Sequence, residues 1–190
     1  MPKKKKESAP AKPDRLNGRN ALNFALGFGQ EATDAAAVNL VLGIEGLDLN
    51  RPWNEHGHTY LLTQCADGRS RNVRRLLDDA RADPNQAAKA GTTPLIAAAN
   101  EGHHRVIAML LEDQRSDVNL VDKEGNSPLL VAAARGFHLC VELLLGDPRT
   151  DPNVAEKNQK RTALHLASVS GYARCVELLL ADARVDLDQR

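Results

Sequence analysis

Residues 91–102 read GTTPLIAAANEG, a pattern with the marks of a turn, a capped helix and a helix end. Thr93 can cap a helix N-terminus with its hydroxyl, and Pro94 suits the first helical position because its missing N–H would be unpaired there anyway. The alanine-rich residues that follow predict a short buried helix whose small side chains let a neighbouring helix approach closely. Gly102 can end this helix because glycine adopts the left-handed backbone conformation at little cost.

The same landmarks recur along the chain at one period. The capping residues Thr59, Thr93, Ser127 and Thr162 are 34, 34 and 35 residues apart. A set of glycines and a set of leucine pairs keep these intervals: Gly68, Gly102, Gly136 and Gly171, and Leu76-Leu77, Leu110-Leu111, Leu144-Leu145 and Leu179-Leu180. Each unit continues into a second segment with apolar residues at helical spacing and closes with a polar loop. Three landmarks with a common period predict a repeat architecture.

The repeated unit resembles the ankyrin repeat. The stretches GTTPLIAA at 91–98 and TALHLA at 162–167 are similar to the family's turn, Thr-Pro-Leu-His signature and alanine-rich helix. The period is also close to the roughly 33 residues of that family. The resemblance covers about residues 57–190 and implies an all-α ankyrin-repeat solenoid of stacked antiparallel helix pairs with projecting β-hairpin loops. We expect four repeats, at 57–90, 91–124, 125–159 and 160–190.

Both ends of the chain differ from the repeats. Residues 1–20 carry many basic residues and three prolines but few apolar ones, which predicts a disordered basic arm. Residues 21–56 keep the junction between helix and hairpin but lack the opening motif, so we expect an N-terminal capping repeat with helices near 20–28 and 31–43. No polar C-terminal cap precedes Arg190. We therefore expect that further repeats or another domain follow, or that another surface covers the last repeat.

The loop after each second helix repeats the pattern Leu-Leu-x-x-x-Arg-x-Asp. Its arginines each stand two residues before an aspartate: Arg81, Arg115, Arg149 and Arg184 before Asp83, Asp117, Asp151 and Asp186. Stacked repeats would align these residues into columns of charge, which could form a ligand-binding stripe. We interpret them instead as turn-stabilising, partly exposed ion pairs, which contribute about 0–1 kcal/mol each.

The last hairpin departs from the pattern of the others. Lys160 stands where Gly57, Gly91 and Gly125 begin the return of the earlier hairpins. A left-handed backbone conformation at this point favours glycine or asparagine. We therefore expect the last hairpin to use Asn158 as its left-handed residue or to take another shape.

The histidines do not form a pattern that indicates catalysis or metal binding. His165 occupies the Thr-Pro-Leu-His position, and the resemblance implies that it forms hydrogen bonds between loops. The pairs at 56 and 58 and at 103 and 104 lack the neighbouring cysteine or carboxylate spacing of a zinc site. We predict that the protein binds no metal.

The cysteines and glycines also lack a catalytic arrangement. Cys140 and Cys175 share one helix register, which indicates small buried hydrophobic residues. Together with Cys65 they form a sparse, odd set typical of reduced thiols in the cytoplasm or nucleus. The run LGFG at 26–29 lacks the spacing of a phosphate-binding loop. We predict no enzyme activity and no cofactor.

Function should then come from surface recognition, and the resemblance implies a non-catalytic protein–protein interaction module or scaffold. Partner-binding candidates are residues that packing does not fix, at the hairpin tips and late in the first helices: Trp53, Asp67, Lys89, Asn100, Glu101, Asp122, Lys123, Arg135, Glu156, Lys157 and Ser170. Trp53 is the only tryptophan and could be an interface anchor or could pack the first hairpin onto the capping repeat. Mixed charges at the tips favour a protein or peptide partner over a polyanion.

Two alternative functions remain open from the sequence. The chain could be an adaptor segment of a larger enzyme or signalling protein. The run PKKKK at 2–6 resembles a nuclear import signal, so a nuclear or nucleic-acid-associated protein is the other alternative. A formal net charge of +0 argues against a protein that coats nucleic acid, and no run of about 18 apolar residues could span a membrane. We expect a cytoplasmic location, with the nucleus as the alternative.

Overall fold

A computed structural model describes residues 42–44 and 46–188. The basic arm expected at 1–20 and nearly all of the two capping helices expected near 20–28 and 31–43 lie outside these residues. The chain divides into two compact units, Met1–Leu47 and Asp48–Arg190. In the first unit, the described residues include a turn in which the Leu47 N–H donates to the Ile44 carbonyl at 3.4 Å. The second unit contains the repeats.

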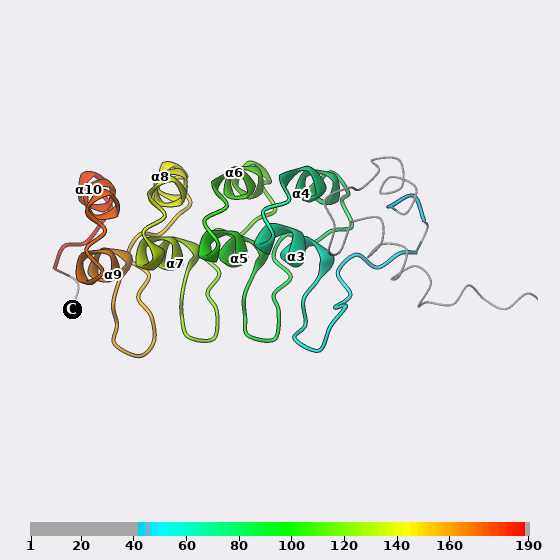
Figure 1. The fold of residues 1–190 in the computed structure, drawn as a ribbon, viewed down its shortest axis with the longest axis horizontal. Helices are drawn as coiled ribbons and strands as arrows, with labels where there is room; N and C mark the ends of the chain where they lie inside the picture. Colours follow the sequence, from blue (N-terminus) through cyan, green and yellow to red (C-terminus); the bar gives the residue numbers. More distant parts are fainter. Residues whose placement is uncertain (1–41, 45, 189–190) are drawn as a thin grey trace, which may run out of the picture. The chain divides into compact units, whose positions relative to one another are not determined.

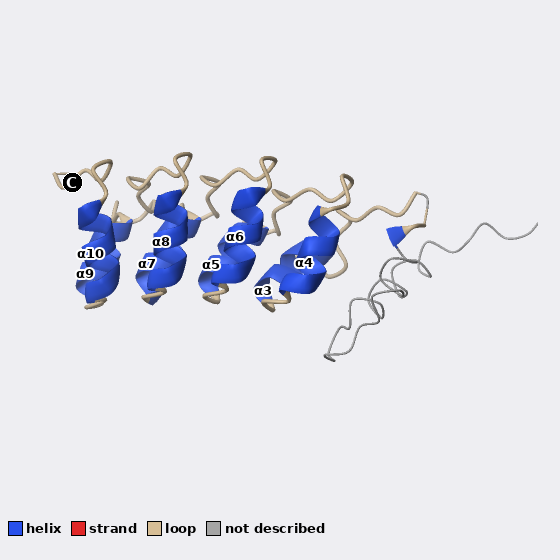
Figure 2. Cartoon of the chain, turned by 90° about the horizontal axis from the view of Figure 1, so that it is seen from above, coloured by secondary structure: helices blue, strands red, loops and turns tan. Residues whose placement is uncertain are grey.

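Residues 48–188 hold four helix pairs, each made of an inner and an outer helix (Figure 1). The inner helices are α3 (Tyr60–Ala66), α5 (Pro94–Asn100), α7 (Pro128–Arg135) and α9 (Ala163–Val169). The outer helices are α4 (Ser70–Leu77), α6 (His104–Glu112), α8 (His138–Gly146) and α10 (Ala173–Ala181). Inner helices pack against inner helices and outer against outer, so the pairs lie side by side (Figure 2). The predicted all-α solenoid of helix pairs is confirmed.

The inner helices begin where the capping residues predicted. The hydroxyls of Thr59, Thr93 and Ser127 each accept the N–H three residues later, at 3.2, 3.2 and 3.3 Å. The fourth helix is capped differently, because Nδ1 of His165 lies 2.8 Å from the Thr162 hydroxyl and 3.3 Å from its backbone nitrogen. His165 therefore caps its own helix, whereas the resemblance implied that it bridges loops.

The two rows of helices meet in a core built from leucine and alanine. Leu76, Leu110, Leu144 and Leu179, one from each outer helix, are all 0% exposed. Alanines of α5 and α7 are buried with them and leave room for the adjacent inner helices. Full burial of a leucine side chain contributes about 1.5–3 kcal/mol, so this repeated layer supplies much of the stability of the stack. The leucines occupy equivalent environments, as the common period predicts.

The glycines after the inner helices are required for two reasons. Gly102 and Gly136 both have φ of 75°, in the left-handed region. A Cβ on Gly102 would also lie 2.8 Å from the ring of Phe137, and one on Gly136 would lie 2.6 Å from the ring of Tyr172. Each ring belongs to the following repeat. These glycines therefore allow the chain to turn and the next repeat to pack closely.

The loops before the inner helices project as fingers away from the outer row (Figure 1). We define finger 1 as residues 51–58, finger 2 as 86–92, finger 3 as 120–126 and finger 4 as 154–161. Each is closed by a backbone hydrogen bond, such as Ala88 N–H to Thr92 O at 2.9 Å. Within residues 42–44 and 46–188, the one β-type pairing is an isolated antiparallel bridge between Ala155 and Thr162. No helix in these ranges has the length and apolar character needed to cross a membrane.

Candidate functional site

The predicted charge columns lie in the loops after the outer helices, which we call joints (79–85, 113–119, 147–153 and 182–188). In each joint an arginine forms a two-pronged ion pair. Arg115 donates from Nε and Nη2 to Asp113 at 3.0 and 2.6 Å. The other three joints have the same pair at 2.6 Å: Asp79–Arg81, Asp147–Arg149 and Asp182–Arg184. The partner is therefore the aspartate two residues before the arginine, whereas the sequence pattern suggested the one after it.

The guanidinium groups of Arg115, Arg149 and Arg184 also reach the preceding repeat. Arg115 donates to the carbonyls of Leu77 and Ala82, at 2.8 and 3.0 Å. Arg149 and Arg184 make equivalent bonds one and two repeats further along. Leu77 ends α4, where helix carbonyls have no partner in the helix and carry partial negative charge. The arginine therefore caps one outer helix while it links two repeats.

The second aspartate and the asparagine of each joint complete this linkage. Asn85 donates to the Arg115 carbonyl at 2.7 Å and accepts the Asp117 N–H at 2.8 Å. The carboxylate of Asp117 in turn accepts the N–H of Asn119 at 3.0 Å. These contacts occupy the polar groups of the joint inside the protein. The joints thus hold the repeats together, and a ligand would have to compete for groups already bonded.

Electrostatics in the joints are consistent with this structural role. The hydrogen bond from Arg115 holds the pKa of Asp113 below its ordinary value, and the bonds from Arg81, Arg149 and Arg184 do the same for the pKa of their aspartates. The carboxylates therefore remain ionised at neutral pH. A carboxylate in this state accepts hydrogen bonds and does not supply an acid for catalysis.

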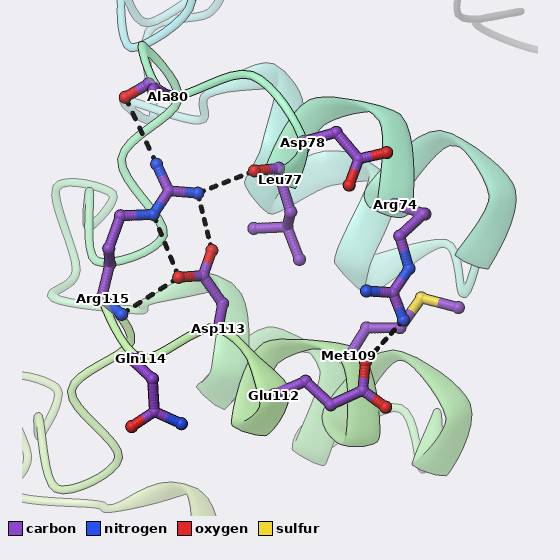
Figure 3. Close-up of a pocket in the computed structure, with 9 residues that line it drawn as sticks. All are labelled: Arg74, Leu77, Asp78, Ala80, Met109, Glu112, Asp113, Gln114 and Arg115. Carbon is purple, nitrogen blue, oxygen red and sulfur yellow. Dashed lines mark hydrogen bonds and ion pairs between the residues drawn. The ribbon is translucent and has the colours of Figure 1, made fainter.

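A cavity of about 380 Å³ lies between α4 and α6, beside one joint (Figure 3). Its lining includes Met109 and two ion pairs, Arg115 with Asp113 and Arg74 with Glu112, the latter at 2.7 Å. The lining residues include no serine, cysteine, histidine or lysine. Figure 3 shows that Arg74 pairs with Glu112 across the gap and that Arg115 pairs with Asp113 within one joint, so the arrangement favours contact between two outer helices over substrate chemistry.

The thiols are placed for packing. Cys65, Cys140 and Cys175 are buried and free. Burial raises the pKa of Cys140 to about 11 and raises the pKa of the other two thiols as well. A raised pKa disfavours the reactive thiolate. Within residues 42–44 and 46–188, no group of three His, Cys, Asp or Glu residues is arranged to hold a metal ion.

The fingertips are linked to one another by their backbones. The N–H groups of Lys89, Lys123 and Lys157 donate to carbonyls of the preceding finger at 2.9, 3.0 and 2.9 Å. A Cβ on Gly91 would lie 2.9 Å from the Lys123 nitrogen, so this approach requires glycine as well as its φ of 85°. The lysines recur at 34-residue intervals. This constant spacing predicts a row of lysines. The row is missed when each lysine is considered separately.

The candidate residues at the ends of the inner helices lie at equivalent positions on successive repeats. Three of them form a chain across two repeats: Arg135 donates to Asn100 at 2.9 Å, and Asn100 donates to Glu101 at 2.6 Å. Asp67 pairs with Arg69 at 3.4 Å, and Ser170 is exposed after α9. The structure thus brings together one group of the predicted site and spaces the others along the row.

Three candidates at the fingertips are held more tightly than expected. Glu156 is 4% exposed, because its carboxylate accepts two backbone N–H groups and the Arg161 side chain of its own finger. It supports finger 4 and does not present its charge outward. Asp122 similarly accepts two N–H groups of finger 3. The indole N–H of Trp53 donates to the Thr63 hydroxyl at 3.0 Å, which anchors the half-buried ring to α3.

Finger 4 also resolves the alternatives for its turn. Lys160 has φ of 57° and takes the left-handed conformation that glycine takes in the other fingers. Asn158, the residue proposed from the sequence, does not. In this longer finger the Glu156 carboxylate accepts the N–H groups of Asn158 and Gln159, and these two bonds close the turn just before Lys160.

Comparison with known proteins agrees with these features. A family model for ankyrin repeats, built as three copies, matches residues 28–120, 65–156 and 114–190. A search of curated proteins finds no match to the sequence. Ankyrin repeats are generally protein–protein interaction modules and are typically non-catalytic. The overlapping matches, the capped inner helices and the finger loops lead to one conclusion: this chain belongs to the ankyrin-repeat family.

Proposed function

We propose that the chain is a non-catalytic scaffold that binds another protein through its fingertips and the exposed ends of its inner helices. One contrast supports this proposal. The charged side chains of the joints form contacts between repeats, whereas Lys89 and Lys123 are exposed on a regular backbone. A surface ordered before binding loses little conformational entropy when a partner docks.

The binding surface combines two kinds of contact. The fingers offer exposed ammonium groups, and the ends of α5 and α7 offer the hydrogen-bonded group of Asn100, Glu101 and Arg135. We propose the cytoplasm as the place of action, since free, buried cysteines are typical of proteins kept in a reducing compartment.

Affinity purification with matched variants tests this function. One variant carries Asn100→Ala and Arg135→Ala on the proposed surface. The control carries Arg71→Ala and Arg105→Ala, two exposed arginines on the outer helices. Both should unfold at the denaturant concentration of the wild type. We expect the first variant to lose a partner that the wild type and the control retain, as quantified by mass spectrometry. Retention of every partner by the first variant, or an equal loss in the control, would reject the proposed surface.

A further inference from the structure

We propose that Lys89, Lys123 and Lys157, which we call the lysine row, bind an extended acidic segment of the partner that presents one carboxylate at every third residue. The inference rests on the proposed function and specifies the chemistry of the partner. It concerns fingers 2, 3 and 4 and does not involve the group formed by Asn100, Glu101 and Arg135.

The backbone fixes the lysine row in a line. Each of the three N–H groups is hydrogen-bonded to the preceding finger, so each lysine is held at the same position of its repeat. The side-chain stems of Lys89 and Lys157 lie over glycines, since a Cβ on Gly57 or Gly125 would be 3.1 or 2.9 Å from their Cγ atoms. All three lysines are exposed. The row thus carries one exposed lysine per repeat, and the ammonium group of Lys157 also donates a hydrogen bond to the Lys123 carbonyl at 2.9 Å.

The acidic side chains of these fingers do not cancel the positive charge of the lysine row. Asp122 and Glu156 direct their carboxylates to N–H groups of their own fingers. Glu124 is the one exposed acidic residue of fingers 2 to 4, whereas Lys160 is a further exposed cation on finger 4. A partner approaching the tips therefore meets an excess of positive charge, which favours an acidic segment.

The spacing of the row selects the conformation of that segment. Helices in contact lie about 8–10 Å apart, so successive inner helices place successive fingers at about this interval. A polyproline II helix has three residues per turn and a rise of about 3.1 Å, which puts every third side chain on one face at about 9.3 Å. A β-strand would place side chains three residues apart on opposite faces. A polyproline II segment with an acid at every third residue therefore matches one lysine per repeat.

A nucleic acid fits this surface less well. Asp122 and Glu156 place their carboxylates beside the row, and Glu124 is exposed. A continuous phosphate backbone would bring its charges close to all three, whereas a peptide with intervening neutral residues would not. The neutral formal charge of the whole chain also gives no long-range attraction for a polyanion.

Fluorescence anisotropy tests the proposal with the full chain and a labelled peptide of four Glu-Pro-Pro units. We expect saturable binding in 50 mM salt that weakens about tenfold at 300 mM, because exposed ion pairs are screened. The triple variant Lys89→Gln, Lys123→Gln, Lys157→Gln should also weaken binding about tenfold, since each exposed pair is worth only a fraction of the total. Substitution of the same lysines by arginine should retain it. A control variant removes the same charge from the outer helices and should bind the peptide as the wild type does. It carries Arg71→Gln, Arg105→Gln and Arg174→Gln.

Several results would overturn the proposal. A peptide of the same composition with its four glutamates adjacent should bind more weakly, and equal binding would reject the spacing argument. Unchanged affinity in the lysine-row variant would reject the row itself. Tighter binding of an oligothymidylate of similar length, with the same dependence on the lysines, would assign the row to nucleic acid. If the peptide fails to bind while partner capture still depends on Asn100 and Arg135, the inference is wrong and the proposed function stands.

Discussion

The joints and the fingertips both recur once per repeat and both carry charge, but they use it differently. In a joint, Arg115 bonds to Asp113 and to three carbonyls of the preceding repeat. At a fingertip, Lys123 contributes its backbone N–H to stacking, and among the described residues its ammonium group has no hydrogen-bonded partner. The same period therefore serves two purposes. Charge that faces the next repeat stabilises the stack, and charge that faces solvent is available to a partner.

The largest effect is expected from breaking a joint. Arg115→Met removes the ion pair to Asp113 and leaves the carbonyl of Leu77 without its donor. We expect a loss of about 2–3 kcal/mol in the free energy of unfolding, because hydrogen bonds to charged groups are strong and Arg115 makes several. Urea denaturation followed by circular dichroism measures this loss. Lys123→Met is the fingertip control and should change stability by less than about 0.5 kcal/mol. Equal losses in the two variants would contradict the division between joints and tips.

Glycine substitutions sharpen the comparison, because they separate backbone conformation from close packing. Gly91→Ala should cost about 2 kcal/mol, since φ is 85° and the new Cβ would lie 2.9 Å from the Lys123 nitrogen. Gly171→Ala should cost about 1 kcal/mol, because φ is 74° but nothing lies within 4 Å of the new Cβ. Thermal unfolding of both variants gives the difference. A larger loss at Gly171 would show that the approach between fingers is not tight.

The joints also predict how stability depends on pH. The pKa of Asp113 and of its equivalents is lowered in the folded state by hydrogen bonds from arginine. Groups of this kind contribute stability above their unfolded pKa of about 3.9, and the contribution is lost as the pH falls through the folded pKa. The free energy of unfolding should therefore fall steadily below about pH 4.

Replacing two joint carboxylates checks the origin of this pH dependence. Asp113→Asn with Asp147→Asn should lower stability at pH 7 and flatten its dependence on pH in the acid range, as measured by urea unfolding between about pH 2 and 7. An unchanged slope in the joint variant would assign acid sensitivity to groups elsewhere.

The smallest effect is expected at finger 4. Lys160→Gly should raise stability by about 0.5 kcal/mol, because a left-handed lysine is strained while glycine loses more entropy on folding. The reverse change at the equivalent position of finger 3, Gly125→Lys, should have a larger and destabilising effect, since φ is 88° and its Cβ would lie 2.9 Å from the Cγ atom of Lys157. Differential scanning calorimetry can resolve both changes. Destabilisation by Lys160→Gly would mean that the lysine side chain makes a contact that outweighs its strain.

The repeated landmarks predicted the fold because each has a local cause. Thr93 caps a helix, Gly102 ends one, and Leu110 recurs in the core, so each could be interpreted without knowledge of distant residues. The ion pairs of the joints could not be assigned in this way. An aspartate stands two residues on either side of Arg115, and the choice depends on Asp117 being engaged with the N–H of Asn119.

The candidate site was predicted less completely, because exposure at a fingertip depends on the shape of the loop. Glu156 lies in a finger with one additional residue, and that loop turns its carboxylate inward. Trp53 is placed by its bond to Thr63, ten residues later in α3. The lysine row has a sequence signal in its 34-residue spacing, but its alignment arises from hydrogen bonds between successive fingers.

Site-specific photocrosslinking tests most directly whether the fingertips are the binding surface. A benzophenone amino acid would replace Lys123 at the tip of finger 3 in one protein, and Arg105 on outer helix α6 in another, both exposed positions. After incubation with the partner identified by affinity purification, we predict adducts from position 123 and none from position 105. Adducts from position 105 alone would show that the outer helices bind the partner and would contradict the account.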